Sequence, residues 1–177
     1  MKFPDGRFNL YFLALVAACL VACETTNPSG SSKAPKGSKD LATIRLHLET
    51  HNDTMGMSRE ITVGPETLQK FFVSGPMLGE PHLVAAQLWE GQPGQYAIHL
   101  QFDREGVRIL EALSMSYRGK RIAIMSQFPE PRWIGTVRLE RRIADGTILF
   151  RPDATRAEAE HIVAGLNRAV AKLNRAR

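Results

Sequence analysis

The chain has 177 residues, 44% hydrophobic and 23% charged, a balance typical of globular proteins rather than of disordered or fibrous ones. The net charge of +5 comes from 23 basic and 18 acidic residues. This basic excess is too diluted by acidic side chains for a dedicated nucleic-acid-binding protein, so no nucleic-acid partner is expected. Both cysteines, Cys19 and Cys23, lie near the N-terminus, which excludes disulfides and cysteine-dependent catalysis from the rest of the chain.

The N-terminal segment has the pattern of a secretory signal peptide. Two basic residues precede an apolar run over residues 10–21, which is shorter than the roughly 20 residues that a membrane-spanning helix needs. The sequence Leu20-Val21-Ala22-Cys23 that follows resembles a bacterial lipobox, whose cysteine becomes the lipidated N-terminus. We expect residues 1–22 to be removed and Cys23 to carry acyl chains that anchor the protein in a membrane. The alternative is an ordinary signal peptide with an incidental Cys23.

A polar segment separates the expected anchor from the rest of the chain. Residues 24–40 are rich in Ser, Gly, Pro, Thr and Lys and contain almost no apolar side chains, so they are predicted to form a flexible linker that spans roughly 23 Å. The expected location is the cell envelope, with the folded part facing the periplasm. Glu24 follows the cysteine where inner-membrane retention favours aspartate, which points weakly to the outer membrane.

The folded domain is predicted to cover residues 41–177 and to open with strands. Apolar and polar residues alternate from residue 42 to residue 49, the pattern of a strand with one buried face. Residues 59–63 are predicted to form its hairpin partner, and residues 70–73 a third strand. Pro81 is typical of the first turn of a helix, so a short helix is predicted from there to Trp89, followed by a strand over residues 96–102.

Two longer helices are predicted in the second half. Asp103 can cap a helix that reaches Arg118 and places Val107, Leu110, Leu113 and Tyr117 toward the core. Residues 121–125 are predicted to be a strand, residues 127–132 a loop, and residues 134–143 and 147–150 a hairpin about Asp145-Gly146. Thr155 and Glu158 form a capping box for the last helix, whose apolar residues extend to Leu173. The predicted fold class is α+β: a largely antiparallel sheet with two longer helices and one short helix packed on one face.

Several short motifs carry a resemblance to a known family. These are residues 79–102 (GEPHLVAAQLWEGQPGQYAIHLQF), 103–107 (DREGV), 119–124 (GKRIAI) and 154–159 (ATRAEA). Together they resemble the head subdomain of the first periplasmic region of the protein-translocase subunit SecD/SecDF. The resemblance covers residues 44–173, and it implies a head-like module that contacts an envelope protein or an exported polypeptide.

The departures from the family pattern limit what the resemblance implies. Residues 126–131 (SQFPEP) replace a turn that usually contains Asp-Gly, and His82 stands where the family usually has Asp. The translocase couples proton flow to export through many membrane spans with buried charges, which this chain lacks once its leader is removed. The resemblance therefore implies a detached head-like module without translocase motor activity. We expect a lipid-anchored binding module in which exposed strand edges and residues 127–133 contact a protein partner.

Binding of a small ligand or a metal in the cell envelope is the alternative function. His47, Glu49 and His51 are expected on one face of the first strand, a spacing that can offer three ligands to a metal. His51, Met55 and Met57 could similarly offer imidazole and thioether ligands to Cu(I). A solvent-facing polar strand and methionines in a satellite core explain the same residues, so no metal and no cofactor is expected.

The remaining patterns argue for binding rather than catalysis. The chain has no Gly-x-Ser-x-Gly, Ser-x-x-Lys, His-Glu-x-x-His or Gly-x-Gly-x-x-Gly motif, and we expect no enzyme activity. Three aromatic residues, Trp89, Phe128 and Trp133, are candidates for anchoring a partner, or else caps on a small core. A set of basic residues is either a binding surface for an anionic group or a solvated charged face; its members are Arg138, Arg141, Arg142, Arg168, Lys172, Arg175 and Arg177.

Overall fold

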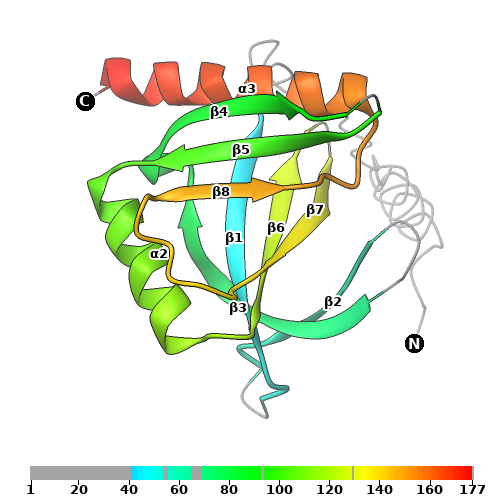
Figure 1. Ribbon diagram of the computed structural model, residues 1–177, viewed down its shortest axis with the longest axis vertical. Coiled ribbons are helices and arrows are strands. Elements are labelled where there is room, and N and C mark those ends of the chain that lie inside the picture. Colours follow the sequence, from blue (N-terminus) through cyan, green and yellow to red (C-terminus); the bar gives the residue numbers. More distant parts are fainter. Residues whose placement is uncertain (1–40, 54–55, 65–68, 93, 129, 177) are drawn as a thin grey trace, which may run out of the picture. The chain divides into compact units, whose positions relative to one another are not determined.

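The computed structural model describes residues 41–176 except 54–55, 65–68, 93 and 129 (Figure 1). All of them belong to one compact unit of the chain. The predicted signal peptide, the lipidated Cys23 and the linker lie outside the described residues. The expected α+β class is confirmed, with antiparallel strand pairing throughout the described sheets.

The strands form two antiparallel sheets rather than the single sheet expected. The five-stranded sheet has the order β2-β3-β1-β6-β7, and the three-stranded sheet has the order β4-β5-β8. The strands are β1 (Thr43–Thr50), β2 (Arg59–Val63), β3 (Gln69–Gly79), β4 (Leu83–Glu90), β5 (Tyr96–Phe102), β6 (Arg121–Gln127), β7 (Pro131–Arg138) and β8 (Thr147–Phe150). Figure 1 shows the strands of the smaller sheet crossing those of the larger one, an arrangement that two packed sheets can adopt.

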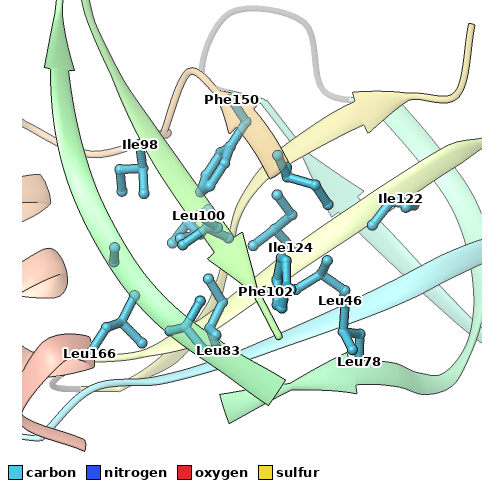
Figure 2. Close-up of a cluster of buried hydrophobic side chains, with 14 of the residues drawn as sticks. Leu46, Leu78, Leu83, Ile98, Leu100, Phe102, Ile122, Ile124, Phe150 and Leu166 are labelled. Atoms are coloured by element: carbon cyan, nitrogen blue, oxygen red, sulfur yellow. The ribbon is translucent and has the colours of Figure 1, made fainter. Parts of the chain in front are cut away.

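The main core lies between the two sheets. The alternation predicted for the first strand is confirmed, because Ile44, Leu46 and Leu48 of β1 are buried there. Figure 2 shows Leu46 and Ile124 of the larger sheet facing Leu100 and Phe150 of the smaller one. Such a layer of interdigitated apolar side chains supplies most of the stabilisation of a domain of this size.

A second apolar cluster occupies the other face of the five-stranded sheet. It contains Ile61, Val63, Phe71, Val73 and Ala123, with Trp133 packed against them. Alternate residues of β6 point to opposite faces, since Ile122 and Ile124 belong to the main core whereas Ala123 belongs to the second cluster. Both faces of the larger sheet therefore carry a buried cluster. The solvent-facing side expected for the first strand holds for Arg45, which is exposed, and was wrong for His47, which is buried.

The two longer helices agree with the sequence analysis. In α2 (Arg104–Ser116), the Asp103 carboxylate accepts the Gly106 N–H at 2.8 Å, and Leu110 and Leu113 enter the main core. Tyr117 follows the end of α2 and is 42% exposed, so the prediction that it faces the core was wrong. Helix α2 ends at Ser116, so Tyr117 does not continue the buried face of the helix.

The last helix, α3 (Arg156–Ala176), buries Ile162, Leu166 and Val170 in the main core. Its predicted capping box is half formed: Thr155 Oγ1 accepts the Glu158 N–H at 3.3 Å, while the Glu158 carboxylate pairs with Arg132. Leu173, expected on the buried face, is exposed near the end of the helix.

The predicted short helix from Pro81 to Trp89 was wrong. Only Glu80–His82 form a helical turn, the 3-10 turn η1, and the chain then becomes β4, which pairs with β5 along its whole length. Pro81 is the second residue of this turn, a position near the helix start where its missing N–H costs no bond. The apolar residues that follow are held extended by their partner strand, a tertiary constraint that overrides local helix preference.

Both predicted hairpins were also wrong in their pairing. The first strand pairs with β3 and β6, and β2 pairs with β3 instead. At the other end, β7 pairs with β6, whereas β8 crosses to the smaller sheet and pairs with β5. Gly146 has a φ of +68°, so the predicted Asp145-Gly146 turn does use the left-handed backbone that favours glycine. It leads into a different sheet rather than into a hairpin.

Candidate functional site

His47 of β1 is buried rather than available as a metal ligand. Its Nδ1 donates to the Ser74 carbonyl oxygen at 2.9 Å, and its ring meets the Trp133 ring edge-on with the centroids 5.0 Å apart. The side chain is 9% exposed. Burial, the largest effect, lowers the pKa of His47 from its ordinary value and so favours the neutral imidazole, which packs against Trp133 beside the second apolar cluster.

Glu49, the second member of the set, is held by an arginine. Its carboxylate accepts the Arg121 Nε–H at 3.0 Å and the Arg121 backbone N–H at 2.9 Å, and the same guanidinium lies over the Phe71 ring at 4.1 Å. The Arg121 side-chain hydrogen bond is the main cause that lowers the pKa of Glu49. A carboxylate fixed in this way stabilises the sheet and is not free to bind a metal.

The structure therefore does not bring the metal-ligand set together. His51 follows β1 and is exposed, whereas His47 is buried and Glu49 is paired with Arg121. Among the residues that the structure describes, no group of three His, Cys, Asp or Glu side chains is arranged to hold a metal ion. Of the alternative copper ligands, Met57 is exposed and Met55 lies outside the described residues.

The three aromatic candidates occupy different environments. Trp133 is partly buried in the second apolar cluster, next to His47. Phe128, in the turn between β6 and β7, packs against the main core, and its ring lies 6.1 Å from that of His161. Only Trp89 is largely accessible, with 52% of its surface exposed. The aromatic side chain best placed to meet a partner is therefore on β4.

Trp89 belongs to the outer face of the three-stranded sheet. In the register of this sheet Trp89 lies opposite Ala97, and His99 lies opposite both Gln87 and Leu149. Leu149 is 50% exposed. In Figure 1 the sheet is seen from this side, and none of the described helices crosses it. We call the residues Trp89, Ala97, His99 and Leu149 the outer face.

The free edge of β4 is partly closed by α3. The Asn167 side chain accepts the Ala86 N–H through Oδ1 at 2.9 Å and donates to the Ala86 carbonyl through Nδ2 at 2.8 Å. An amide placed in this way imitates a neighbouring strand, so at Ala86 a further strand cannot pair with β4. Figure 1 shows α3 running along this edge.

The predicted basic set is split between two places. Arg138, Arg141 and Arg142 line a cavity of about 470 Å³ beside the chain segment that connects β7 to β8. Lys172 and Arg175 are exposed on α3, together with Arg168, and Arg177 lies outside the described residues. Sequence reasoning missed this cavity because its walls come from strands of both sheets, and it missed Leu149, which also lines it.

Within the described ranges, no helix combines the length and the hydropathy needed to cross a bilayer. A scan of protein-family models and a search of curated proteins found no match. The fold, in contrast, has counterparts among solved structures.

One similar structure is SecDF in its super-membrane-facing form, with 19% sequence identity and a TM-score of 0.54; the match covers 74% of this chain and 19% of that chain. Another is a structure of SecDF, a membrane component that enhances protein export, with 17% identity and a TM-score of 0.54; this match covers 96% of this chain and 72% of that one. The chain thus spans about a fifth of the first of these proteins. At such identities the likeness concerns the fold, and the described part of this chain has a SecDF-like α+β fold.

Proposed function

We propose that this protein is an extracytoplasmic binding module, anchored by lipid at Cys23, that contacts exported or envelope polypeptides and has neither a catalytic nor a motor activity of its own. The observation that carries the proposal is the SecDF-like fold, because one of the matched structures is of a membrane component that enhances protein export. The lipobox-like sequence before Cys23 and the polar segment after it supply the means of attachment.

The outer face is the surface that we assign to this contact. Trp89 and Leu149 are half exposed on a sheet face that no described helix covers, whereas Trp133 and Phe128 pack against the two cores. Accessible aromatic and aliphatic side chains on an otherwise polar surface are typical anchors for a partner. We therefore move the expected contact from residues 127–133 to the outer face, in the cell envelope on the periplasmic side.

Binding of an unfolded exported polypeptide tests the proposal. The full chain, purified in detergent, is titrated into a fluorescently labelled exported protein kept unfolded, and anisotropy reports binding. Trp89→Ser is expected to weaken binding by about thirtyfold, as for a typical aromatic hot spot. Met115→Ser is the matched control, because Met115 is 62% exposed on α2 and its loss is expected to leave the affinity unchanged. Equal affinities for all three proteins, or no binding by the wild type, would contradict the proposal.

A further inference from the structure

The cavity lined by Arg138, Arg141 and Arg142 is a groove between two strand edges. One wall is the end of β7, the other is the start of β8, and the connection between them closes the floor. At one end the sheets meet: the Asp153 N–H donates to the Ile134 carbonyl at 2.6 Å, and the Gly135 backbone lies against the Phe150 ring. Away from that contact the two sheets separate and leave a volume of about 470 Å³, within the range of ligand sites.

The β8 wall presents backbone groups that β5 does not use. The Phe102 N–H donates to the Gly146 carbonyl at 3.0 Å, and the register continues with Leu100 opposite Ile148. Bonded pairs recur at every second residue of an antiparallel ladder, so the backbone groups of Leu149 point away from β5. The adjacent outward N–H, that of Thr147, is taken by Asp145 Oδ1 at 3.1 Å. The open part of the edge is therefore centred on Leu149.

The charges around the groove favour an acidic occupant. Arg142 is paired with Glu111. The Asp145 carboxylate accepts the Thr147 N–H, and this bond together with the charge of Arg141 lowers its pKa, so Asp145 keeps its negative charge. Arg138 uses its Nε for the Gly119 carbonyl at 3.2 Å, which leaves the ends of its guanidinium for other contacts. Arg141 is exposed and makes no hydrogen bond or ion pair within the described part of the chain.

Further charged residues lie in the segment that connects β7 to β8. Glu140 and Asp145 are the acidic residues of the lining. The Glu140 backbone carbonyl accepts from Arg118 Nε at 3.1 Å, which brings a further guanidinium near the rim. Three arginines that form no salt bridge within the described ranges, Arg118, Arg138 and Arg141, thus stand against two carboxylates. Guanidinium groups are well suited to bind carboxylates in pairs of hydrogen bonds.

We propose that this groove binds an extended peptide segment with acidic side chains, which adds to β8 as a strand beside Leu149 while Arg138 and Arg141 bind its carboxylates. The main chain of the peptide would supply affinity through ladder hydrogen bonds, and the arginines would select for acidic sequences. This inference rests on the proposed function, since it names the class of polypeptide segment and the edge that receives it. Leu149 joins the groove to the outer face, so one partner can occupy both.

Peptide binding to the full chain, measured by fluorescence anisotropy in detergent, tests the groove. The probe is a labelled peptide of sequence TEVEVET, and the control probe is TKVKVKT, which has the same length and alternation but the opposite charge. The acidic peptide is expected to bind and to lose affinity as salt is added, and Arg141→Glu is expected to weaken it about tenfold. Lys172→Glu, a charge reversal at an exposed position of α3, is the matched control and is expected to change little.

Proline at the open edge tests the strand pairing. Leu149→Pro removes the outward N–H without removing a bond to β5, so it is expected to abolish peptide binding, whereas Leu149→Ala, which keeps the N–H, is expected to retain most of it. Should Leu149→Pro reduce the melting temperature, the same acidic peptide with N-methyl groups on alternate residues provides the equivalent test from the ligand side. Two such peptides are compared, one N-methylated at the odd-numbered residues and one at the even-numbered residues. Loss of affinity for one of the two supports the added strand.

Equal binding of the two probes, an unchanged affinity for Arg141→Glu, or undiminished binding of both N-methylated peptides would overturn the groove proposal. The proposed function fails separately. If the unfolded exported protein binds through Trp89 while TEVEVET does not bind, the groove assignment is wrong and the binding module stands. If neither binds, both proposals are wrong.

Discussion

The contact between the two sheets at Gly135 gives the most specific test of the fold. A Cβ atom at this position would lie 2.7 Å from Cδ2 of Phe150, 3.1 Å from its Cε2 and 3.2 Å from the Arg151 carbonyl oxygen. Phe150 is buried in the main core, and the backbone carbonyl belongs to the chain that leaves β8. Neither neighbour can move away without opening the packing between the sheets, so Gly135→Ala is predicted to destabilise the protein.

The expected loss in the free energy of unfolding is about 1–3 kcal/mol, the usual cost of inserting a methyl group into a filled core. For a chain of this size, each kcal/mol corresponds to a fall of about 2–4 °C in the melting temperature. Urea unfolding followed by circular dichroism gives the first quantity, and thermal unfolding gives the second. Tryptophan fluorescence in a Trp89→Phe background provides an independent probe, because Trp133 packs in the second apolar cluster.

Gly75 is the matched control. It lies in β3, it is exposed, no atom lies within 4 Å of a Cβ built there, and its φ is not in the left-handed region. Gly75→Ala is expected to leave the protein unchanged or to stabilise it by about 0.4–1 kcal/mol, because alanine restricts the unfolded chain. Equal stabilities of the two variants would refute the close approach of the sheets at Gly135 and Phe150.

Three further variants test separate parts of the account. Glu49→Gln is expected to cost about 1–2 kcal/mol at neutral pH by breaking the charge-assisted bonds with Arg121. Because those bonds lower the pKa of Glu49, its contribution is complete above the ordinary glutamate pKa and is lost as the pH falls through the lowered value, so urea unfolding of variant and wild type should converge in acid. Asn167→Leu leaves the Ala86 N–H and carbonyl without their partner and is expected to cost about 1–3 kcal/mol in the same assay. Cys23→Ser is expected to abolish the incorporation of radiolabelled palmitate into the protein and to leave residues 1–22 attached.

Each of these variants has a control or a result that would contradict it. Glu105→Gln breaks an exposed ion pair with Arg108 and is expected to change stability little at any pH. An equally small loss of stability in Glu49→Gln would contradict the role assigned to Arg121. Asn174→Leu replaces an exposed asparagine of the same helix, so a loss as large as that of Asn167→Leu would argue against the closed edge of β4. Incorporation of labelled palmitate into Cys23→Ser at the level of the wild type would contradict the lipid anchor.

The elements predicted correctly are those whose signals are local. The alternation of β1, the Asp103 cap and the apolar period of α2 and α3 are all written in neighbouring residues, and the structure confirms them. A capping side chain and a buried stripe act on a helix wherever it lies in the fold, so they can be identified without knowing the partner elements.

The errors fall where pairing is not local. The segment 83–90 lacks a clear alternation and follows Pro81, a combination that favoured a helix, but β5 and Asn167 of α3 hold it extended. The turn at Asp145-Gly146 was identified by its residue types, yet these residues do not determine which strand β8 joins. Turn chemistry fixes the local backbone, whereas the choice of partner depends on how the whole core packs.

The candidate site was harder to predict for the same reason. The set His47, Glu49 and His51 has a plausible ligand spacing, but the second apolar cluster buries His47 and Arg121 takes Glu49. Trp89 was identified from its residue type, although it was expected on a helix. The groove beside Leu149 forms only where the two sheets diverge, and no pattern in one stretch of sequence indicates such a place.

Capture of partners in living cells is the measurement that tests the central claim most directly. A photoreactive amino acid replaces Trp89 in the full chain, and a second strain carries it at Met115 as the exposed control. Cross-linked species are then identified by mass spectrometry. The account predicts that exported polypeptides or components of the export machinery are captured at Trp89 and not at Met115. Capture of the same bulk envelope proteins and lipids at both positions would contradict it, and the SecDF-like fold would then serve a different function in this protein.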